Sequence, residues 1–235
     1  MYLQRYKLGK GEGSLKLMFV RHGEMGDHPR PHSEVEIPPE GYLTDLGIQQ
    51  ARMVTRYLER FSFRAIYSSP YGRAYQTGYE LARRKGMAIK ILEWFREFSM
   101  GDVHEDLPEE KRYMEETWEN PEGWESCLGF AERVRNGMRR LLREYGICER
   151  YGGFVFEGTP EGTLLFFGHG GSIGEALKYL LGIPPSPRPF VNIHCGAAIM
   201  VLFKEIRGVH YPVLSLEPPF FPDFPGWEDG ISVYN

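Results

Sequence analysis

The sequence has few cysteines and no long apolar run. Its three cysteines, Cys127, Cys148 and Cys195, are odd in number and widely separated, so they do not indicate a disulfide framework. No apolar run approaches the ~20 residues that cross a bilayer, and residues 1–13 lack the apolar core of a signal peptide. These absences predict a cytoplasmic protein that has no membrane partner.

A strong net charge is also absent. The 28 Lys and Arg residues nearly balance the 32 Asp and Glu residues, which leaves −4 at pH 7. Because so small a charge creates no strong field around the whole molecule, nucleic acid is not an expected partner, and any attraction for phosphate must be local. The 235 residues are enough for one sizeable core, and no repeat divides them, so we expect one domain over residues 1–235.

Apolar runs alternate with amphipathic patterns along the chain, which is typical of an α/β protein. We expect strands at residues 15–20, 65–67, 88–92, 164–167 and 197–203. We expect helices that follow Thr44 and that cover residues 71–85, 128–145 and 173–181. The pattern predicts a three-layer α/β/α sandwich with a mostly parallel central sheet.

Three segments do not fit this alternation. Residues 101–125 are acidic and aromatic, and we expect them to form a cap over the carboxyl edge of the sheet. Residues 25–42 and residues 217–235 each contain four prolines, which exclude a regular helix. The first of these is expected to be a loop that borders the active site, and the second an irregular strap packed on the fold.

Two histidines follow directly on apolar runs. The segment Arg21-His22-Gly23-Glu24 closes the first run, and Gly168-His169-Gly170-Gly171 closes the run at residues 164–167. In an open α/β sheet, sites form outside the carboxyl ends of the strands, so the two segments are expected to share one site. The glycines allow close backbone approach, and the first amides of the following helix favour an anion.

A third segment, residues 67–73, also closes a strand and opens a helix, with Arg73 near the first turn. Guanidinium groups offer planar forks of donors to phosphoryl oxygens, and a neutral imidazole can attack phosphorus. Arg21, Arg73 and the two histidines therefore predict a cage for a phosphoryl group. Taken alone, Arg73 also fits a solvated helix face, and His169 fits a buried, hydrogen-bonded histidine.

In their order along the chain, these motifs resemble those of the histidine phosphatase superfamily, which is also called phosphoglycerate mutase-like. The resemblance spans residues 15–203. It rests on residues 21–24, 43–47 (LTDLG), 68–77 (SSP leading to Arg73 and Thr77), 96–101 and 168–171. The resemblance implies a phosphoglycerate mutase-like fold and a phosphomonoesterase that needs no cofactor.

The resemblance also implies roles for the matched residues. His22 would take the phosphoryl group and form a phosphohistidine. Arg21 and Arg73 would stabilise the charge on the equatorial oxygens in the transition state. His169 would donate to a phosphoryl oxygen, which requires an environment in which this histidine is protonated.

The leaving oxygen needs a group that protonates it and later activates water. Glu97 matches the family best at this step. Asp102 and Glu105 stay alternatives, because a carboxylate in so acidic a segment is usually only solvated.

Further residues are expected to bind the substrate. Gly23, Glu24 and Gly170 belong to the two histidine motifs. Asn192 and His194, ahead of the last strand, would line the pocket or else form an ordinary loop. The family often has Asn four residues beyond Glu24, where this chain has His28, and His28 would replace the amide contact. Prolines beside His28 exclude helical spacing of its neighbouring histidine, so no metal site is expected.

Three functions fit these motifs, and we favour a phosphatase that acts on a small-molecule phosphomonoester. A cofactor-dependent phosphoglycerate mutase would return the phosphoryl group to a bound sugar acid. Such mutases typically have Arg-His-Tyr-Gly after the catalytic Glu, where residues 98–102 of this chain read FSMGD. A catalytically silent phospho-ligand binding module would require a missing acid at Glu97. The identity of the substrate and the formation of a homodimer stay open.

Overall fold

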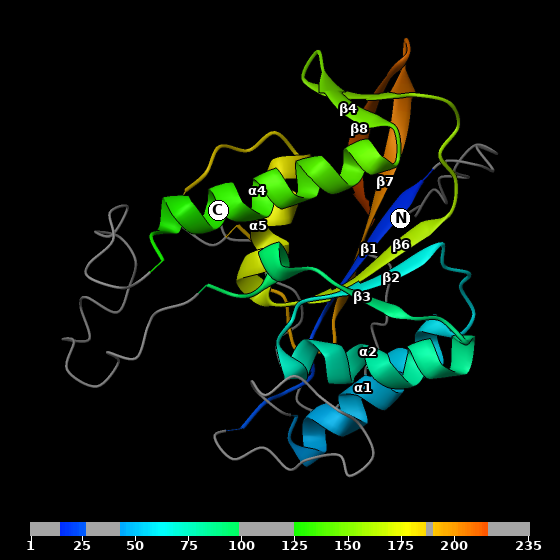
Figure 1. Ribbon diagram of the computed structural model, residues 1–235, viewed down its shortest axis with the longest axis vertical. Coiled ribbons are helices and arrows are strands. Elements are labelled where there is room, and N and C mark those ends of the chain that lie inside the picture. The colour runs from blue at the N-terminus through cyan, green and yellow to red at the C-terminus, as the bar shows by residue number, and fades with distance from the viewer. Residues whose placement is uncertain (1–14, 27–42, 99–124, 187–189, 216–235) are drawn as a thin grey trace, which may run out of the picture.

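An eight-stranded sheet forms the centre of the protein, with helices on both sides (Figure 1). The computed structural model describes residues 15–26, 43–98, 125–186 and 190–215. Its elements are β1 (Lys16–Arg21), α1 (Asp45–Leu58), β2 (Ala65–Ser68), α2 (Gly72–Lys85), β3 (Ile89–Ile91), the 3₁₀ turn η1 (Glu93–Phe95), α4 (Cys127–Glu144), β4 (Ile147–Arg150), β5 (Gly153–Phe156), β6 (Thr163–Gly168), α5 (Gly170–Leu180), β7 (Ala198–Ile206) and β8 (Val209–Ser215).

The strand order is β3-β2-β6-β1-β7-β8-β5-β4. The four strands β3, β2, β6 and β1 are parallel, whereas β7, β8, β5 and β4 add to them in antiparallel fashion. The α/β prediction is therefore confirmed, but the sheet is mixed instead of mostly parallel. The motifs at residues 21–24, 68–73 and 168–171 each close a strand of the parallel half.

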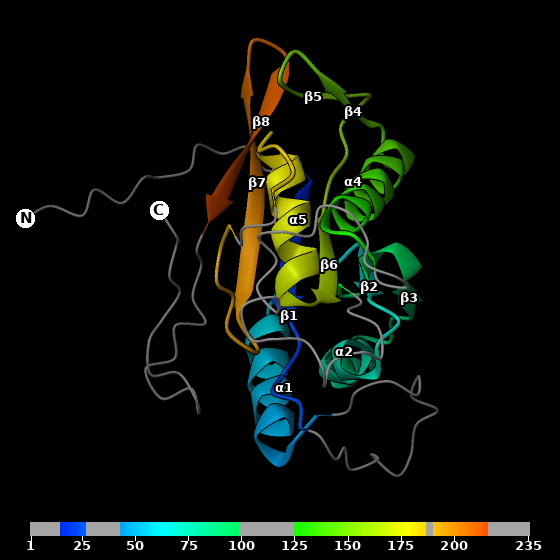
Figure 2. The same ribbon diagram turned by 90° about the vertical axis from the view of Figure 1, so that its left-hand side faces the viewer.

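Alternation along β1 explains the three layers. Leu17 and Phe19 belong to a core shared with α4 and α5, while Met18 and Val20 belong to a second core shared with α1 and α2. Side chains of a strand alternate between its two faces, so the two cores lie on opposite sides of the sheet. In Figure 1 the strands β1, β6 and β2 run between α4 and α5 on one side and α1 and α2 on the other, and Figure 2 shows the same elements turned by 90°, with α1 and α2 at the lower end.

Helix boundaries follow the predicted signals closely. The Thr44 hydroxyl accepts the Gly47 N–H at 3.1 Å and caps α1, as expected from sequence. Helix α2 ends at Gly86, which has a left-handed φ of 63°. The Ser126 hydroxyl caps α4 by accepting the Gly129 N–H at 2.9 Å.

Two antiparallel hairpins differ from the sequence-based expectation. Strands β4 and β5 meet at Tyr151-Gly152, and β7 and β8 meet at Arg207-Gly208, with positive φ at all four residues. Two-residue turns of this kind normally contain Asn-Gly or Asp-Gly. Tyr-Gly and Arg-Gly lack that signal, which is why the sequence predicted no strand between residues 145 and 164 and none after residue 203.

Some expectations fall on other parts of the chain. The strap at residues 217–235 lies outside the described residues, as does the cap at residues 101–125 except for Glu125. The proline-rich loop at residues 25–42 is described only at its first two residues. Within the described ranges, no helix has the length and apolar character needed to cross a membrane.

Candidate active site

The two motif histidines meet at the carboxyl ends of neighbouring strands. Arg21, the last residue of β1, is in register with Gly168, the last residue of β6. The His22 N–H donates to the Gly168 carbonyl at 2.9 Å, and the ring centroids of His22 and His169 lie 5.1 Å apart. Residues that are far apart in sequence therefore share one site, as the motifs predicted.

The backbone determines which nitrogen of His22 is available for chemistry. Its Nδ1 lies 2.6 Å from the Gly23 carbonyl oxygen. Because a carbonyl only accepts hydrogen bonds, Nδ1 carries the proton and Nε2 keeps its lone pair. Burial, aided by the positive charges of Arg73 and Arg21, lowers the pKa of His22 from 6.5 to about 3. His22 is thus a neutral imidazole with an unprotonated Nε2.

The turn that carries His22 is held by close backbone contacts. A Cβ added to Gly23 would lie 2.5 Å from the Gly47 carbonyl oxygen, so the turn packs directly on the start of α1. The Gly23 N–H donates to Thr77 Oγ1 at 3.0 Å, and the Thr77 hydroxyl donates to the Arg73 carbonyl at 2.7 Å. These contacts account for the glycines in two of the recognised motifs.

His169 lies at the start of α5, fully buried, and both its ring nitrogens have protein partners. Arg73 Nε–H donates to Nδ1 at 3.1 Å, and Nε2 lies 2.7 Å from Ser69 Oγ. Burial lowers the pKa of His169 well below its usual value, with Arg73, His22 and Arg21 acting in the same direction. The described surroundings of His169 therefore favour its neutral ring, and its protonation during the reaction stays a prediction.

Only some of the N–H donors of Arg21 bind protein groups among the described residues. One of its terminal nitrogens, Nη1, donates to the Ile193 carbonyl, and its guanidinium carbon would lie 3.7 Å from a Cβ placed on Gly170. Its Nε is buried without a hydrogen-bond partner among the described residues. A buried donor without a partner costs free energy, so this N–H is suited to an anionic ligand.

Glu97 joins the site through the first turn of α5. Its Oε2 accepts the Gly171 N–H at 3.0 Å, and its Oε1 accepts the Phe98 N–H at 2.9 Å. Two residues before Glu97, Phe95 is fully buried against Gly168. A Cβ added to Gly168 would lie 2.4 Å from the Phe95 ring. The predicted acid therefore lies beside the His169 motif.

The remaining predicted residues have varied positions. The Glu24 N–H donates to Gln50 Oε1 at 2.7 Å, and its carboxylate accepts the Thr44 hydroxyl at 2.9 Å, so Glu24 ties the site to α1. Asn192 and His194 flank Ile193, whose carbonyl binds Arg21. His28 lies outside the described residues, as do the alternative acids Asp102 and Glu105.

Sequence reasoning missed two residues around the site. Ser69 contacts His169 Nε2, and the only sequence signal for it was its place in the SSP motif. Arg133, on α4, binds the backbone of the Glu97 segment, and nothing in the local sequence marks it. Among the described residues there is no group of three His, Cys, Asp or Glu side chains that could hold a metal ion.

Comparisons with known proteins find a family, related sequences and a similar fold. The model of the histidine phosphatase superfamily (branch 1) matches residues 17–208. Glucosyl-3-phosphoglycerate phosphatase of Mycobacterium tuberculosis is 28% identical over 184 residues, covering 74% of this chain and 78% of that protein. A probable phosphoglycerate mutase of Yersinia pestis is 27% identical over 177 residues, covering 72% and 76%. The solved structure of mycobacterial glucosyl-3-phosphoglycerate phosphatase superposes with a TM-score of 0.63 at 23% identity, covering 86% of this chain and 97% of that one.

Proposed function

The chain belongs to the histidine phosphatase superfamily (branch 1), and we propose that it is a cytoplasmic phosphatase that hydrolyses a small-molecule phosphomonoester through a phosphohistidine on His22. The observation that carries this proposal is the state of His22. With Nδ1 bound to the Gly23 carbonyl and a pKa of about 3, its Nε2 lone pair is available at neutral pH. An activated nucleophile beside guanidinium groups is what phosphoryl transfer requires.

In the first step, His22 Nε2 attacks phosphorus, the N–P bond forms, and the bond between phosphorus and the leaving oxygen breaks. Arg21 and Arg73 stabilise the charge that builds up on the phosphoryl oxygens. The Arg21 Nε–H, which has no hydrogen-bond partner among the described residues, is suited to this task. Protonated Glu97 gives its proton to the leaving oxygen, so that the product leaves as a neutral alcohol.

In the second step, the Glu97 carboxylate takes a proton from water while the water oxygen attacks phosphorus. The N–P bond then breaks, inorganic phosphate leaves, and His22 returns to its neutral imidazole form. His169 is neutral in the arrangement described above, but a nearby phosphoryl dianion raises the pKa of an imidazole. We therefore expect that Arg73 turns from His169 Nδ1 to the phosphoryl oxygens when substrate binds, and that His169 then gains a proton and donates to one of these oxygens.

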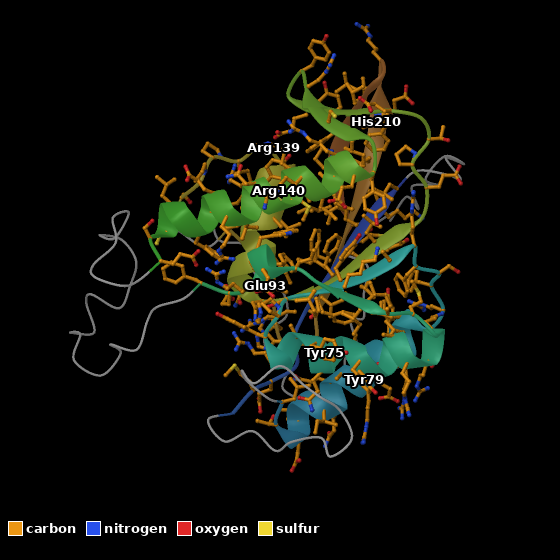
Figure 3. All side chains as sticks on the ribbon, viewed as in Figure 1. Tyr75, Tyr79, Glu93, Arg139, Arg140 and His210 are labelled. Atoms are coloured by element: carbon orange, nitrogen blue, oxygen red, sulfur yellow. The ribbon has the colours of Figure 1, made fainter. Side chains whose placement is uncertain are left out.

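The test is phosphate release from a panel of phosphomonoesters, measured without added metal for the wild type and His22→Ala. We expect release that disappears in the variant. The matched control is His210→Ala, since His210 lies on β8 at the far end of the sheet (Figure 3). Rapid quenching should also trap protein-bound phosphate that is stable to base and labile to acid, and that is absent from His22→Ala.

Interconversion of 3-phosphoglycerate and 2-phosphoglycerate is measured beside the panel. Isomerisation without net hydrolysis would contradict the phosphatase and indicate a mutase. Binding of inorganic phosphate without either activity would indicate a binding module. A wild type and a His22→Ala variant that release phosphate equally would refute His22 as the nucleophile.

A further inference from the structure

The proposed acid Glu97 lies just beyond η1, outside regular secondary structure. Arg96, between η1 and Glu97, already has an extended backbone with φ −63° and ψ 159°. Contacts from Gly171 and Phe98 hold the carboxylate, but neither of them holds the carbonyls of the segment that leads to it. Helix α4 packs against η1 and supplies the side chain that does so.

That side chain is Arg133. Its Nη1 donates to the Trp94 carbonyl at 2.8 Å and to the Arg96 carbonyl at 3.1 Å, and its Nη2 donates to the Glu97 carbonyl at 3.4 Å. One guanidinium therefore binds three carbonyls within four residues, and the last of them belongs to the acid itself.

The guanidinium is fixed in turn by Glu125, the residue before the N-cap of α4. Arg133 Nε and Nη2 lie 2.5 Å from the two Glu125 oxygens, in a bidentate pair whose side chains are only 15% and 14% exposed. Together with the three carbonyls, this pair uses all five N–H groups of the guanidinium. Lysine has three donors and no planar fork, so it cannot reproduce this arrangement.

We propose that Arg133 is a positioning residue for Glu97. By holding the backbone of residues 94–97, Arg133 fixes where the Glu97 carboxyl group lies relative to the leaving oxygen of the substrate. The proposal rests on the proposed function, because it assigns Arg133 to the protonation step of that reaction. A purely structural role for Arg133, in which it only joins α4 to η1, would slow every substrate to the same degree.

The experiment compares kcat/KM for esters with good and poor leaving groups, namely p-nitrophenyl phosphate and an alkyl phosphate. Nitrophenolate leaves without help from an acid, whereas an alkoxide needs a proton. In Arg133→Met and Arg133→Lys we expect a loss of about 10- to 100-fold for the alkyl ester and a loss of about threefold or less for the nitrophenyl ester. Glu97→Gln should show the same selectivity, and adding Arg133→Met to it should cost little more.

The matched control is Arg139→Met on the same helix. Arg139 is half-buried and pairs with Glu149 at 2.8 Å, and Figure 3 shows it on α4. We expect this variant to keep the wild-type selectivity. Equal losses for both esters, or full activity, in a folded Arg133→Lys protein would overturn the proposal. A wild type that hydrolyses neither ester would instead refute the proposed function, and the positioning role with it.

Discussion

At the scale of single residues, the site depends on contacts too short to accept one additional methyl group. Gly171 on α5 is the clearest case, because its N–H binds Glu97 Oε2 and a Cβ at this position would lie 2.4 Å from Glu97 Oε1. With alanine at this position, the Glu97 carboxylate would have to move from its present place. The contact with Glu97 therefore favours glycine at this position, whereas helix propensity favours alanine.

We predict that Gly171→Ala lowers kcat/KM for an alkyl phosphate by about 10-fold or more, because the acid is displaced. Alanine is favoured over glycine inside a helix by about 1 kcal/mol, so the loss should not come from unfolding of α5. Gly174→Ala is the control, since among the described residues nothing beyond the adjacent backbone of α5 lies within 4 Å of an added Cβ there. Steady-state kinetics and thermal unfolding of both variants decide the matter, and equal activities would contradict the predicted displacement.

The sequence predicts which residues meet at the site, but not all of the contacts that their side chains make. The motifs brought His22, His169, Arg21 and Arg73 to one place, because strand ends in a parallel sheet share an edge. They did not predict that His169 Nδ1 accepts from Arg73, because that depends on side-chain directions across two helices. Nor did they predict Arg133, whose position is determined by the packing of α4 on η1.

At the scale of elements, the N-terminus of α1 also holds the turn that carries His22. Thr44 Oγ1 accepts the Gly47 N–H and also donates to the Glu24 carboxylate. The same hydroxyl therefore caps α1 and ties it to the turn that carries His22. Ser126 caps α4 in the same way, but among the described residues it makes no hydrogen bond to that turn.

We predict that Thr44→Ala and Ser126→Ala each lower the free energy of unfolding by about 1 kcal/mol, which is the usual cost of a lost N-cap. Only Thr44→Ala should also lower kcat/KM by more than the loss of folded protein explains. Urea unfolding and kinetics on the same samples measure both quantities. A larger loss of activity in Ser126→Ala would argue against the coupling of α1 to the site.

Elements with strong periodicity were predicted well, and the reason for the exceptions is local. The helices and the parallel strands have apolar patterns at their own period, and their ends carry caps such as Thr44 and Gly86. The hairpins turn at Tyr151-Gly152 and Arg207-Gly208, where non-glycine residues adopt positive φ. Tyrosine and arginine rarely do so, and tertiary pairing within the sheet overrides their preference.

At the scale of the whole molecule, two neutral histidines are buried in the folded protein. The pKa of His22 falls to about 3 on folding, and that of His169 is also lowered. In the unfolded chain both would titrate near the ordinary value of about 6.5. As the pH falls below that value, the unfolded state therefore binds protons that the folded state does not.

We predict that the free energy of unfolding is greatest above about pH 6.5 and falls as the pH is lowered from 7.5 to 5.5, by up to about 1.4 kcal/mol per pH unit for each histidine once the unfolded chain is protonated. The slope should become shallower in His22→Asn and in His169→Asn, even if each substitution changes the stability at pH 7.5. Urea unfolding across this range measures the slope. An unchanged slope in both variants would contradict the neutral state of these histidines.

The register of β1 on β6 has a consequence for folding. Arg21 lies opposite Gly168, so His22 and His169 approach each other only when two strands distant along the chain have paired. Such long-range pairing is slow, because the intervening chain must first be ordered. Enzyme activity that returns during refolding therefore reports the closure of this strand pair, and it lags behind the signal of the helices, which form from local contacts.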